Sequence, residues 1–280
     1  MDIRLIAFDL DGTFLDDAKN IPPENLEALC AAAERGCLIV PATGRIYKGI
    51  PAALRELPFM RWYITANGSY IYDAVEDKAV ARAEIPAQRA VEFFRYADTL
   101  PVLYDCYQDN FGYISRGFLE RVPDYVTDPG ILKLVRDLRV PVDELKVYLL
   151  DKGEGVQKLQ LYFEDMDLRS RLLDQLPQAW PDLSFSTSVP FNIEINSRKA
   201  TKGQAMCTLC ALLGLDPANA MGLGDGTNDL DLITRAGVGV AMENAAAEVR
   251  AAADYVTGNN NRGGFAAAIE RFALDGIGSA

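Results

Sequence analysis

Two carboxylates, Asp9 and Asp11, stand one residue apart at the end of the apolar run LIAF, and a Gly-Thr turn follows at once. An apolar run before such a turn is typical of a buried strand, and side chains two positions apart on a strand point to the same side. Like charges held this close repel each other, and a divalent cation bound through oxygen ligands would relieve that repulsion. The spacing therefore indicates a metal-binding pair, and the alternative is a polar turn that ends a core strand.

Three more polar clusters lie next to predicted elements. TGR (43–45) and GDGTND (224–229) each end an apolar strand, and TKG (201–203) begins a helix. Ligands of open parallel sheets bind beyond the carboxyl ends of the strands, so these clusters are expected to converge on one site. They combine carboxylates for a cation with hydroxyl, amide and cationic groups for an anion. The structural alternatives are an ordinary turn for TGR, a solvated lysine for TKG and a helix cap for GDGTND.

Composition excludes several classes of protein. The 280-residue chain contains no histidine, which excludes Ser-His-Asp and Cys-His catalysis and His-ligated zinc sites. Its net charge of −12 and its lack of a Lys/Arg stripe argue against nucleic-acid and membrane-surface partners and favour a small-molecule partner. It has no apolar run of about 18 residues and no signal-peptide pattern, and its odd number of cysteines is consistent with reduced thiols. We therefore expect a cytoplasmic protein that does not span a membrane.

The order of predicted elements indicates an α/β fold. Strands and helices alternate over residues 3–82 and again over the last third, as in the two halves of a doubly wound, mostly parallel sheet. The middle carries alternating, aromatic-rich strands that are typical of an α+β domain with an antiparallel sheet. We predict a core of residues 1–83 and 191–280 and an inserted domain of residues 84–190, which is a candidate lid.

The order DLDGTFLD, TGR, TKG and GDGTND resembles the haloacid dehalogenase superfamily. The long insertion between TGR and TKG, preceded by ANGSYIYD, resembles the Cof-type (subfamily IIB) sugar-phosphatase branch. The resemblance covers nearly the whole chain. It implies a Rossmann-like catalytic core and a C2-type α+β cap that determines substrate specificity.

The resemblance also implies a role for each cluster. Asp9 would be the nucleophile that forms an aspartyl-phosphate, and Asp11 would be the general acid and base. Mg²⁺ would be held by a group of oxygen donors, namely the Asp9 carboxylate, the Asp11 carbonyl and Asp225, with Asp229 at or just behind them. The expected contacts of the phosphoryl group or substrate are Thr43, Gly44, Arg45, Asn67, Lys202 and Asn228.

Arg45 and Asn67 also have structural alternatives, since Arg45 could pair with an acid and Asn-Gly is a common turn. The predicted function is Mg²⁺-dependent hydrolysis of small phosphomonoesters such as sugar phosphates. One alternative is a phosphomutase that uses the same residues. An alternative of another class is a non-catalytic protein that binds a phosphorylated ligand, since fold does not determine function.

Overall fold

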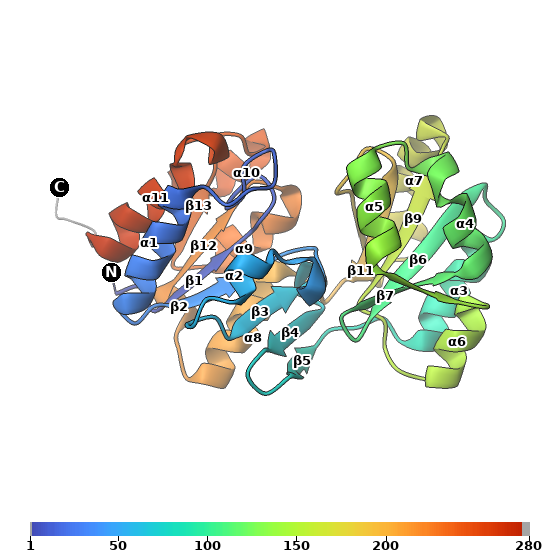
Figure 1. Cartoon of the computed structure of the whole chain (residues 1–280), viewed down its shortest axis with the longest axis horizontal. Helices are drawn as coiled ribbons and strands as arrows, with labels where there is room; N and C mark the ends of the chain where they lie inside the picture. Colours follow the sequence, from blue (N-terminus) through green and yellow to red (C-terminus); the bar gives the residue numbers. More distant parts are fainter. Residues whose placement is uncertain (1, 276–280) are drawn as a thin grey trace. The chain divides into compact units, whose positions relative to one another are not determined.

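The computed structural model describes residues 2–275 and divides the chain into two compact units. The first unit consists of Met1–Thr43, Pro51–Ala81 and Thr201–Ala280, and the second consists of Gly44–Ile50 and Arg82–Ala200. Figure 1 colours the chain from its N-terminus to its C-terminus.

The first unit is built on a parallel sheet of five strands in the order β14, β13, β12, β1, β2. Leu5 lies opposite Ala220 on one neighbouring strand and Leu38 on the other. The strands are β1 (Leu5–Phe8), β2 (Leu38–Pro41), β12 (Ala220–Gly224), β13 (Val238–Ala241) and β14 (Tyr255–Val256). This sheet, with helices packed on both faces, confirms the predicted doubly wound α/β core.

Alternate residues of β1 determine which helices cover each face of the sheet. Leu5 and Ala7 pack with apolar residues of α8 and α9. Phe8 points to the other face, where its ring is tilted against Phe14 and edge-on to Phe265 of α11. Figure 1 shows α1 beside α11. The helices of this unit are α1 (Pro23–Glu34), α2 (Ala52–Arg55), α8 (Lys202–Leu213), α9 (Leu230–Arg235), α10 (Ala247–Ala252) and α11 (Gly264–Ile269). Its short helices are η2 (Ala66–Gly68), η3 (Pro217–Asn219), η4 (Thr227–Asp229), η5 (Asn260–Arg262) and η6 (Glu270–Leu274).

The segment after β2 differs from the sequence prediction. The expected strand near residue 63 is β3 (Trp62–Thr65), which forms an antiparallel sheet with β4 (Tyr70–Asp73) and β5 (Lys78–Arg82). One parallel bridge, between Ala42 and Ile64, connects it to the end of β2. The helix before it is the short α2, which begins directly after Pro51, because a proline inside a longer helix would remove a backbone hydrogen bond.

The second unit contains a six-stranded sheet in the order β10, β11, β9, β6, β7, β8. Its strand pairs are antiparallel except for β7 with β8, and helices pack against it. The strands are β6 (Val102–Gln108), β7 (Phe111–Ser115), β8 (Arg139–Val142), β9 (Lys158–Phe163), β10 (Leu183–Ser186) and β11 (Asn192–Ser197). The helices are η1 (Tyr47–Gly49), α3 (Ala87–Ala97), α4 (Arg116–Tyr125), α5 (Pro129–Leu138), α6 (Leu145–Lys152) and α7 (Met166–Ala179).

The α+β character of this unit agrees with the prediction, but its extent differs from the expected 84–190. β11 begins after residue 190 and pairs with β9 and β10, so the unit continues to Ala200. The segment Gly44–Ile50 also belongs to it. The predicted boundaries followed the positions of two prolines, whereas strand pairing determines which residues pack together.

Candidate active site

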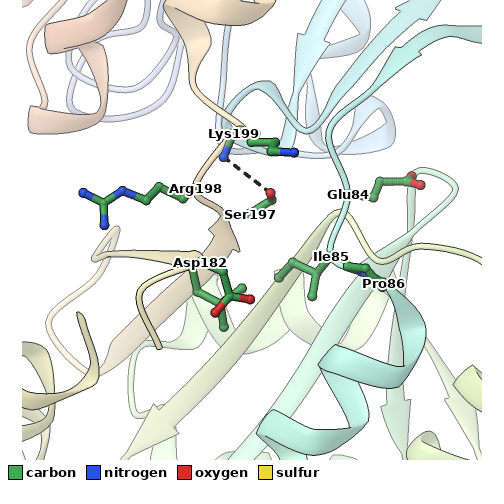
Figure 2. Close-up of a pocket in the computed structure, with 8 residues that line it drawn as sticks. Glu84, Ile85, Pro86, Asp182, Ser197, Arg198 and Lys199 are labelled. Carbon is green, nitrogen blue, oxygen red and sulfur yellow. Dashed lines mark hydrogen bonds between the residues drawn. The ribbon is translucent and has the colours of Figure 1, made fainter. Parts of the chain in front are cut away.

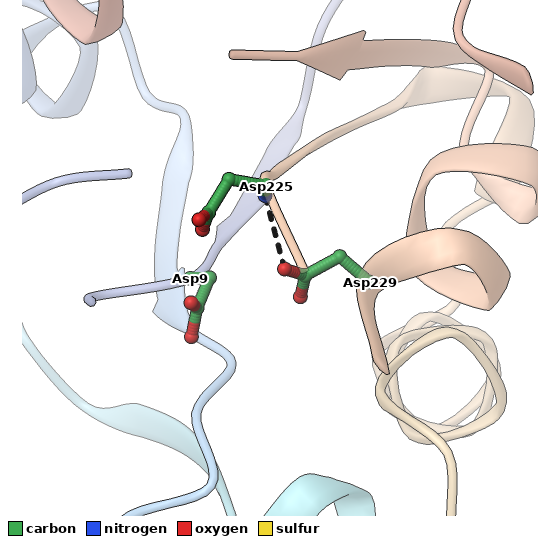
Figure 3. Close-up of side chains that lie close together, drawn as sticks. All are labelled: Asp9, Asp225 and Asp229. Atoms are coloured by element: carbon green, nitrogen blue, oxygen red, sulfur yellow. Dashed lines mark hydrogen bonds between the residues drawn. The ribbon is translucent and has the colours of Figure 1, made fainter. Parts of the chain in front are cut away.

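Three carboxylates meet at the carboxyl edge of the parallel sheet. Asp9 follows β1 and Asp225 follows β12, so two neighbouring parallel strands bring them to the same edge. Asp229 comes from η4, one turn further along the chain. One carboxylate oxygen from each residue lies within 4.8 Å of the other two (Figure 3). The sequence prediction placed these three residues in one site, and the fold brings them together.

The turn after Asp9 approaches Asp225 closely because residue 12 is glycine. Gly12 has a φ of +79°, and a Cβ at this position would lie 2.3 Å from Oδ2 of Asp225. The next residue, Thr13, donates its hydroxyl to Oδ1 of Asp225 at 3.0 Å. A glycine is therefore required here both for the backbone conformation and for the space that the carboxylate occupies.

Lys202 lies fully buried between two of the carboxylates. Its Nζ donates to Oδ1 of Asp9 at 2.7 Å and to Oδ1 of Asp229 at 2.6 Å. It is the first residue of α8, and the side chain of Thr201 caps that helix by accepting from the amide of Gln204. Burial disfavours the charged form, but the charges of Asp229 and Asp9 outweigh it and raise the pKa of Lys202 above its usual range.

Glycine also explains how α8 can bring Lys202 to this position. A Cβ on Gly203 would lie 2.1 Å from the backbone oxygen of Asp231 in α9. The two helices therefore pack backbone against backbone at the start of α8, and the TKG cluster owes its glycine to this contact.

Asp229 organises the site with both carboxylate oxygens. Oδ1 accepts from Lys202, and Oδ2 accepts from the backbone amides of Asp225 at 3.1 Å and Gly226 at 3.0 Å. The side chain is fully buried. Its hydrogen bonds place it behind the carboxylates of Asp9 and Asp225, as a group that holds Lys202 and the 225–226 turn in place.

The site is electrostatically suited to a divalent cation. The pKa of Asp9 is raised to about 8, mainly by burial, with Lys202 opposing the shift and Asp229 adding to it. The pKa of Asp225 is raised to about 6, again mainly by burial and then by the charge of Asp229. The ionised forms of these two carboxyl groups are thus disfavoured in the protein alone. A bound cation such as Mg²⁺ would favour the ionised forms and lower both pKa values.

Asp11 is more exposed than the other carboxylates. Its Oδ1 lies 2.8 Å from Nζ of Lys19, and about two fifths of its side chain is accessible, at 38%. Its charge contributes to the raised pKa values of both Asp9 and Asp225. Asp11 is therefore close enough for its charge to act on both carboxyl groups.

Three asparagines that are distant in sequence hold the turn that carries Asp11. Asn25 donates its amide to the carbonyl of Phe14 at 2.8 Å, Asn244 donates to that of Gly12 at 2.8 Å, and Asn260 donates to that of Leu15 at 3.0 Å. Asn244 also accepts from the backbone amide of Asn260 at 3.1 Å. No local sequence pattern distinguishes Asn25 or Asn260 from other loop and helix residues, so neither was predicted to be a site residue.

Thr43, Asn67 and Asn228 form a second group in the first unit. Thr43 is buried, and its carbonyl accepts from the backbone amide of Asn67 at 3.0 Å. The Asn67 side chain in turn accepts from Nδ2 of Asn228 at 3.2 Å. Asn228 adjoins Asp229 in η4, so this group is continuous with the carboxylate cluster.

Gly44 and Arg45 belong to the second unit, although they follow Thr43 directly. Arg45 donates from a guanidinium nitrogen to the carbonyl of Gly49 at 2.8 Å. A phosphate contact by these two residues stays a prediction.

The second unit also contains a cavity of about 430 Å³, shown in Figure 2. Its charged lining residues are Glu84, Asp182, Arg198 and Lys199. None of the predicted site residues lines it, and two of its charged residues are paired with arginines, Glu84 with Arg82 and Asp182 with Arg89. The three carboxylates and Lys202 lie instead at the carboxyl edge of the parallel sheet in the first unit. Within residues 2–275, no helix has both the length and the apolar character needed to cross a membrane.

Comparison with known proteins identifies the family. A haloacid dehalogenase-like hydrolase model matches residues 6–269. The chain is 30% identical to the 5-amino-6-(5-phospho-D-ribitylamino)uracil phosphatase YcsE of Bacillus subtilis, over 98% of this chain and 97% of that protein. It is 26% identical to the Escherichia coli phosphatase of the same activity, YbjI, over 97% and 96% of the two chains.

A solved structure agrees with these relatives. The crystal structure of a haloacid dehalogenase-like hydrolase from Bacteroides thetaiotaomicron superposes with a TM-score of 0.80 at 26% identity, covering 96% of this chain and 99% of that one. The chain therefore belongs to the haloacid dehalogenase-like hydrolases, in their Cof-type phosphatase branch.

Proposed function

We propose that this phosphatase hydrolyses small phosphomonoesters with the help of Mg²⁺, through a covalent phosphoryl intermediate on Asp9. The observation that carries the proposal is the buried Lys202, whose Nζ binds Asp9 at 2.7 Å beside the carboxylates of Asp225 and Asp229. A cation, a nucleophilic carboxylate and a cluster of hard oxygen donors are the parts that phosphoryl transfer requires.

The reaction would proceed in two displacements at phosphorus. In the first, an Asp9 oxygen forms a bond to phosphorus while the bond to the leaving oxygen breaks, and Asp11 gives its proton to the departing alkoxide. In the second, Asp11 takes a proton from water as the water oxygen attacks phosphorus. The Asp9 to phosphorus bond then breaks and releases inorganic phosphate, so both residues return to their initial states.

The other side chains would hold charge in place during both steps. Lys202 and Thr43 would bind the phosphoryl oxygens, and Asp229 would keep Lys202 oriented through the 2.6 Å bond between them. Mg²⁺, when bound by the Asp9 and Asp225 carboxylates and the Asp11 carbonyl, would supply positive charge that offsets the repulsion between the nucleophile and the phosphate.

For the substrate we propose a small phosphorylated metabolite, such as a sugar phosphate or a phosphorylated sugar alcohol derivative. Two of the relatives named above act on a phosphoribitylamino-substituted uracil, which supports a polyhydroxylated leaving group. A cytoplasmic location is part of this proposal, and the five free cysteines support a reducing compartment.

The test is phosphate release from a panel of sugar phosphates and other phosphorylated metabolites, with and without Mg²⁺, by the wild type and by Asp9→Asn. We expect release to require both Mg²⁺ and Asp9. Retained turnover in Asp9→Asn would exclude the covalent route. Isomerisation of an ester without release of phosphate would instead identify a phosphomutase.

A further inference from the structure

The turn between β3 and β4 has an unusual backbone. Ala66, Asn67 and Gly68, here called the 66–68 turn, have successive φ angles of +48°, +59° and +96°. All three residues are buried. A two-residue hairpin turn of the common Asn-Gly type needs positive φ only at its two central residues. Ala66 is a third residue in the left-handed region, and its Cβ makes that conformation strained. Backbone strain of this kind persists only where surrounding contacts impose it.

The 66–68 turn contacts three segments of the candidate active site. The backbone amide of Asn67 donates to the carbonyl of Thr43 at 3.0 Å, and its side-chain oxygen accepts from Asn228 at 3.2 Å. A Cβ on Gly68 would lie 2.2 Å from the carbonyl oxygen of Thr201, the residue before Lys202. One short turn therefore touches the segments that carry Thr43, Asn228 and Lys202.

We infer that the 66–68 turn is a positioning element for phosphoryl binding, and that Asn67 acts through Asn228 and Thr43. Its left-handed backbone turns the Asn67 amide towards Thr43 and the Asn67 side chain towards Asn228. A hairpin that served only to reverse the chain would not need a third left-handed residue or contacts with three separate segments. This inference rests on the proposed function, because Thr43 and Lys202 are the groups assigned there to the phosphoryl oxygens.

The experiment compares Asn67→Gly, Asn228→Ala and the double variant. Glycine retains the left-handed backbone and the amide to Thr43 and removes only the side chain that binds Asn228. For Asn67→Gly we expect KM and the inhibition constant of inorganic phosphate to rise about three- to tenfold, the effect of one lost, partly buried hydrogen bond. The values of kcat and the Mg²⁺ dependence should stay within about twofold, because the variant removes a hydrogen bond to Asn228 and leaves the carboxylates of Asp9, Asp225 and Asp229 unchanged. The double variant should bind phosphate no more weakly than Asn228→Ala, since the two residues act through one bond.

Asp77→Ala is a matched control. Asp77 also has a positive φ, of +48°, and lies in the turn between β4 and β5 of the same sheet, where its carboxylate accepts from the hydroxyl of Tyr72. It lies outside the site, so phosphate inhibition should be unchanged. Equal weakening by Asp77→Ala would overturn the inference, because any damage to this sheet would then have the same effect.

Two other results would also overturn it. Additive effects in the double variant would mean that Asn67 does not act through Asn228, and an unchanged inhibition constant in Asn67→Gly would mean that its side chain does not position the phosphate site. Asp9→Asn separates this inference from the proposed function. If Asp9→Asn retains turnover, the proposed function fails. If it is inactive while Asn67→Gly matches the wild type, only the inference about the 66–68 turn fails.

Discussion

Replacement of Lys202 by methionine tests the electrostatic account of the site. Methionine has a similar length and no charge, so the variant keeps the apolar packing of the side chain and removes the ammonium that binds Asp9 at 2.7 Å and Asp229 at 2.6 Å. Both partners are buried, so the change leaves two carboxylates facing each other without their cation. Breaking a buried ion pair in this way costs about 3–5 kcal/mol.

That loss corresponds to a large change in melting temperature. At about 2–4 °C per kcal/mol for chains of this size range, Lys202→Met should melt about 6–20 °C below the wild type at pH 7 without a divalent cation. Two further expectations follow from the sign of the charge. Lowering the pH should reduce the difference in melting temperature between the variant and the wild type, because the carboxylates become protonated. Mg²⁺ should stabilise the variant more than the wild type.

Activity should fall as well, because the ammonium is expected to bind the phosphoryl oxygens. Loss of one such group costs about 10²–10³ in rate. The control is Lys133→Met, which removes an exposed lysine paired with Asp137 and should change stability by less than about 1 kcal/mol. Melting curves and phosphate release measure both quantities. A Lys202→Met protein that melts within 2 °C of the wild type at pH 7, about 1 kcal/mol or less, would refute the reasoning.

Three more predictions follow from the same geometry. The pKa of Asp9 is raised from 3.8 to about 8 and that of Asp225 to about 6, so their contribution to stability is fully present below about pH 4 and is lost as the pH rises to about 8. Melting temperatures of the metal-free protein should therefore fall over this range, and Mg²⁺ should reduce the fall; a flat profile without metal would contradict this. Asn25→Ala should destabilise the protein by about 1–3 kcal/mol for each of the two buried backbone groups that it leaves unpaired, as measured by urea unfolding. The same variant should lower kcat more than it raises KM, because it releases the turn that carries the proposed general acid, and an unchanged kcat would count against that role. Gly12→Ala should raise the Mg²⁺ concentration needed for half-maximal activity at least severalfold, because its Cβ would lie 2.3 Å from Oδ2 of Asp225, and titration of activity with Mg²⁺ measures this. An unchanged Mg²⁺ requirement would show that Asp225 does not help to hold the metal.

The sequence by itself determined the fold class and the position of the reactive side chains at the ends of strands. Apolar runs of strand length, each ending in a polar turn, led to a parallel sheet with Asp9 and Asp225 at one edge, and the structure brings these two residues together. The absence of histidine limited acid-base chemistry near neutral pH to carboxylates, lysine, tyrosine and bound water. These inferences succeed because strand periodicity and turn residues are local properties, and parallel strands share a carboxyl edge whatever else the chain does.

Only the tertiary structure determined which side chains form hydrogen bonds and ion pairs with each other. The contact of Lys202 with Asp9 and Asp229, the amide of Asn25 on the turn after Asp11, and the contact between Asn67 and Asn228 join segments that are 11 to 193 residues apart.

The extent of the second unit was also decided in this way, because β11 belongs to it through pairing with β9 and β10. None of these contacts changes the local periodicity of the chain. They depend on where packing brings distant backbones and on whether a buried polar group finds a partner there, and these are properties of the folded whole.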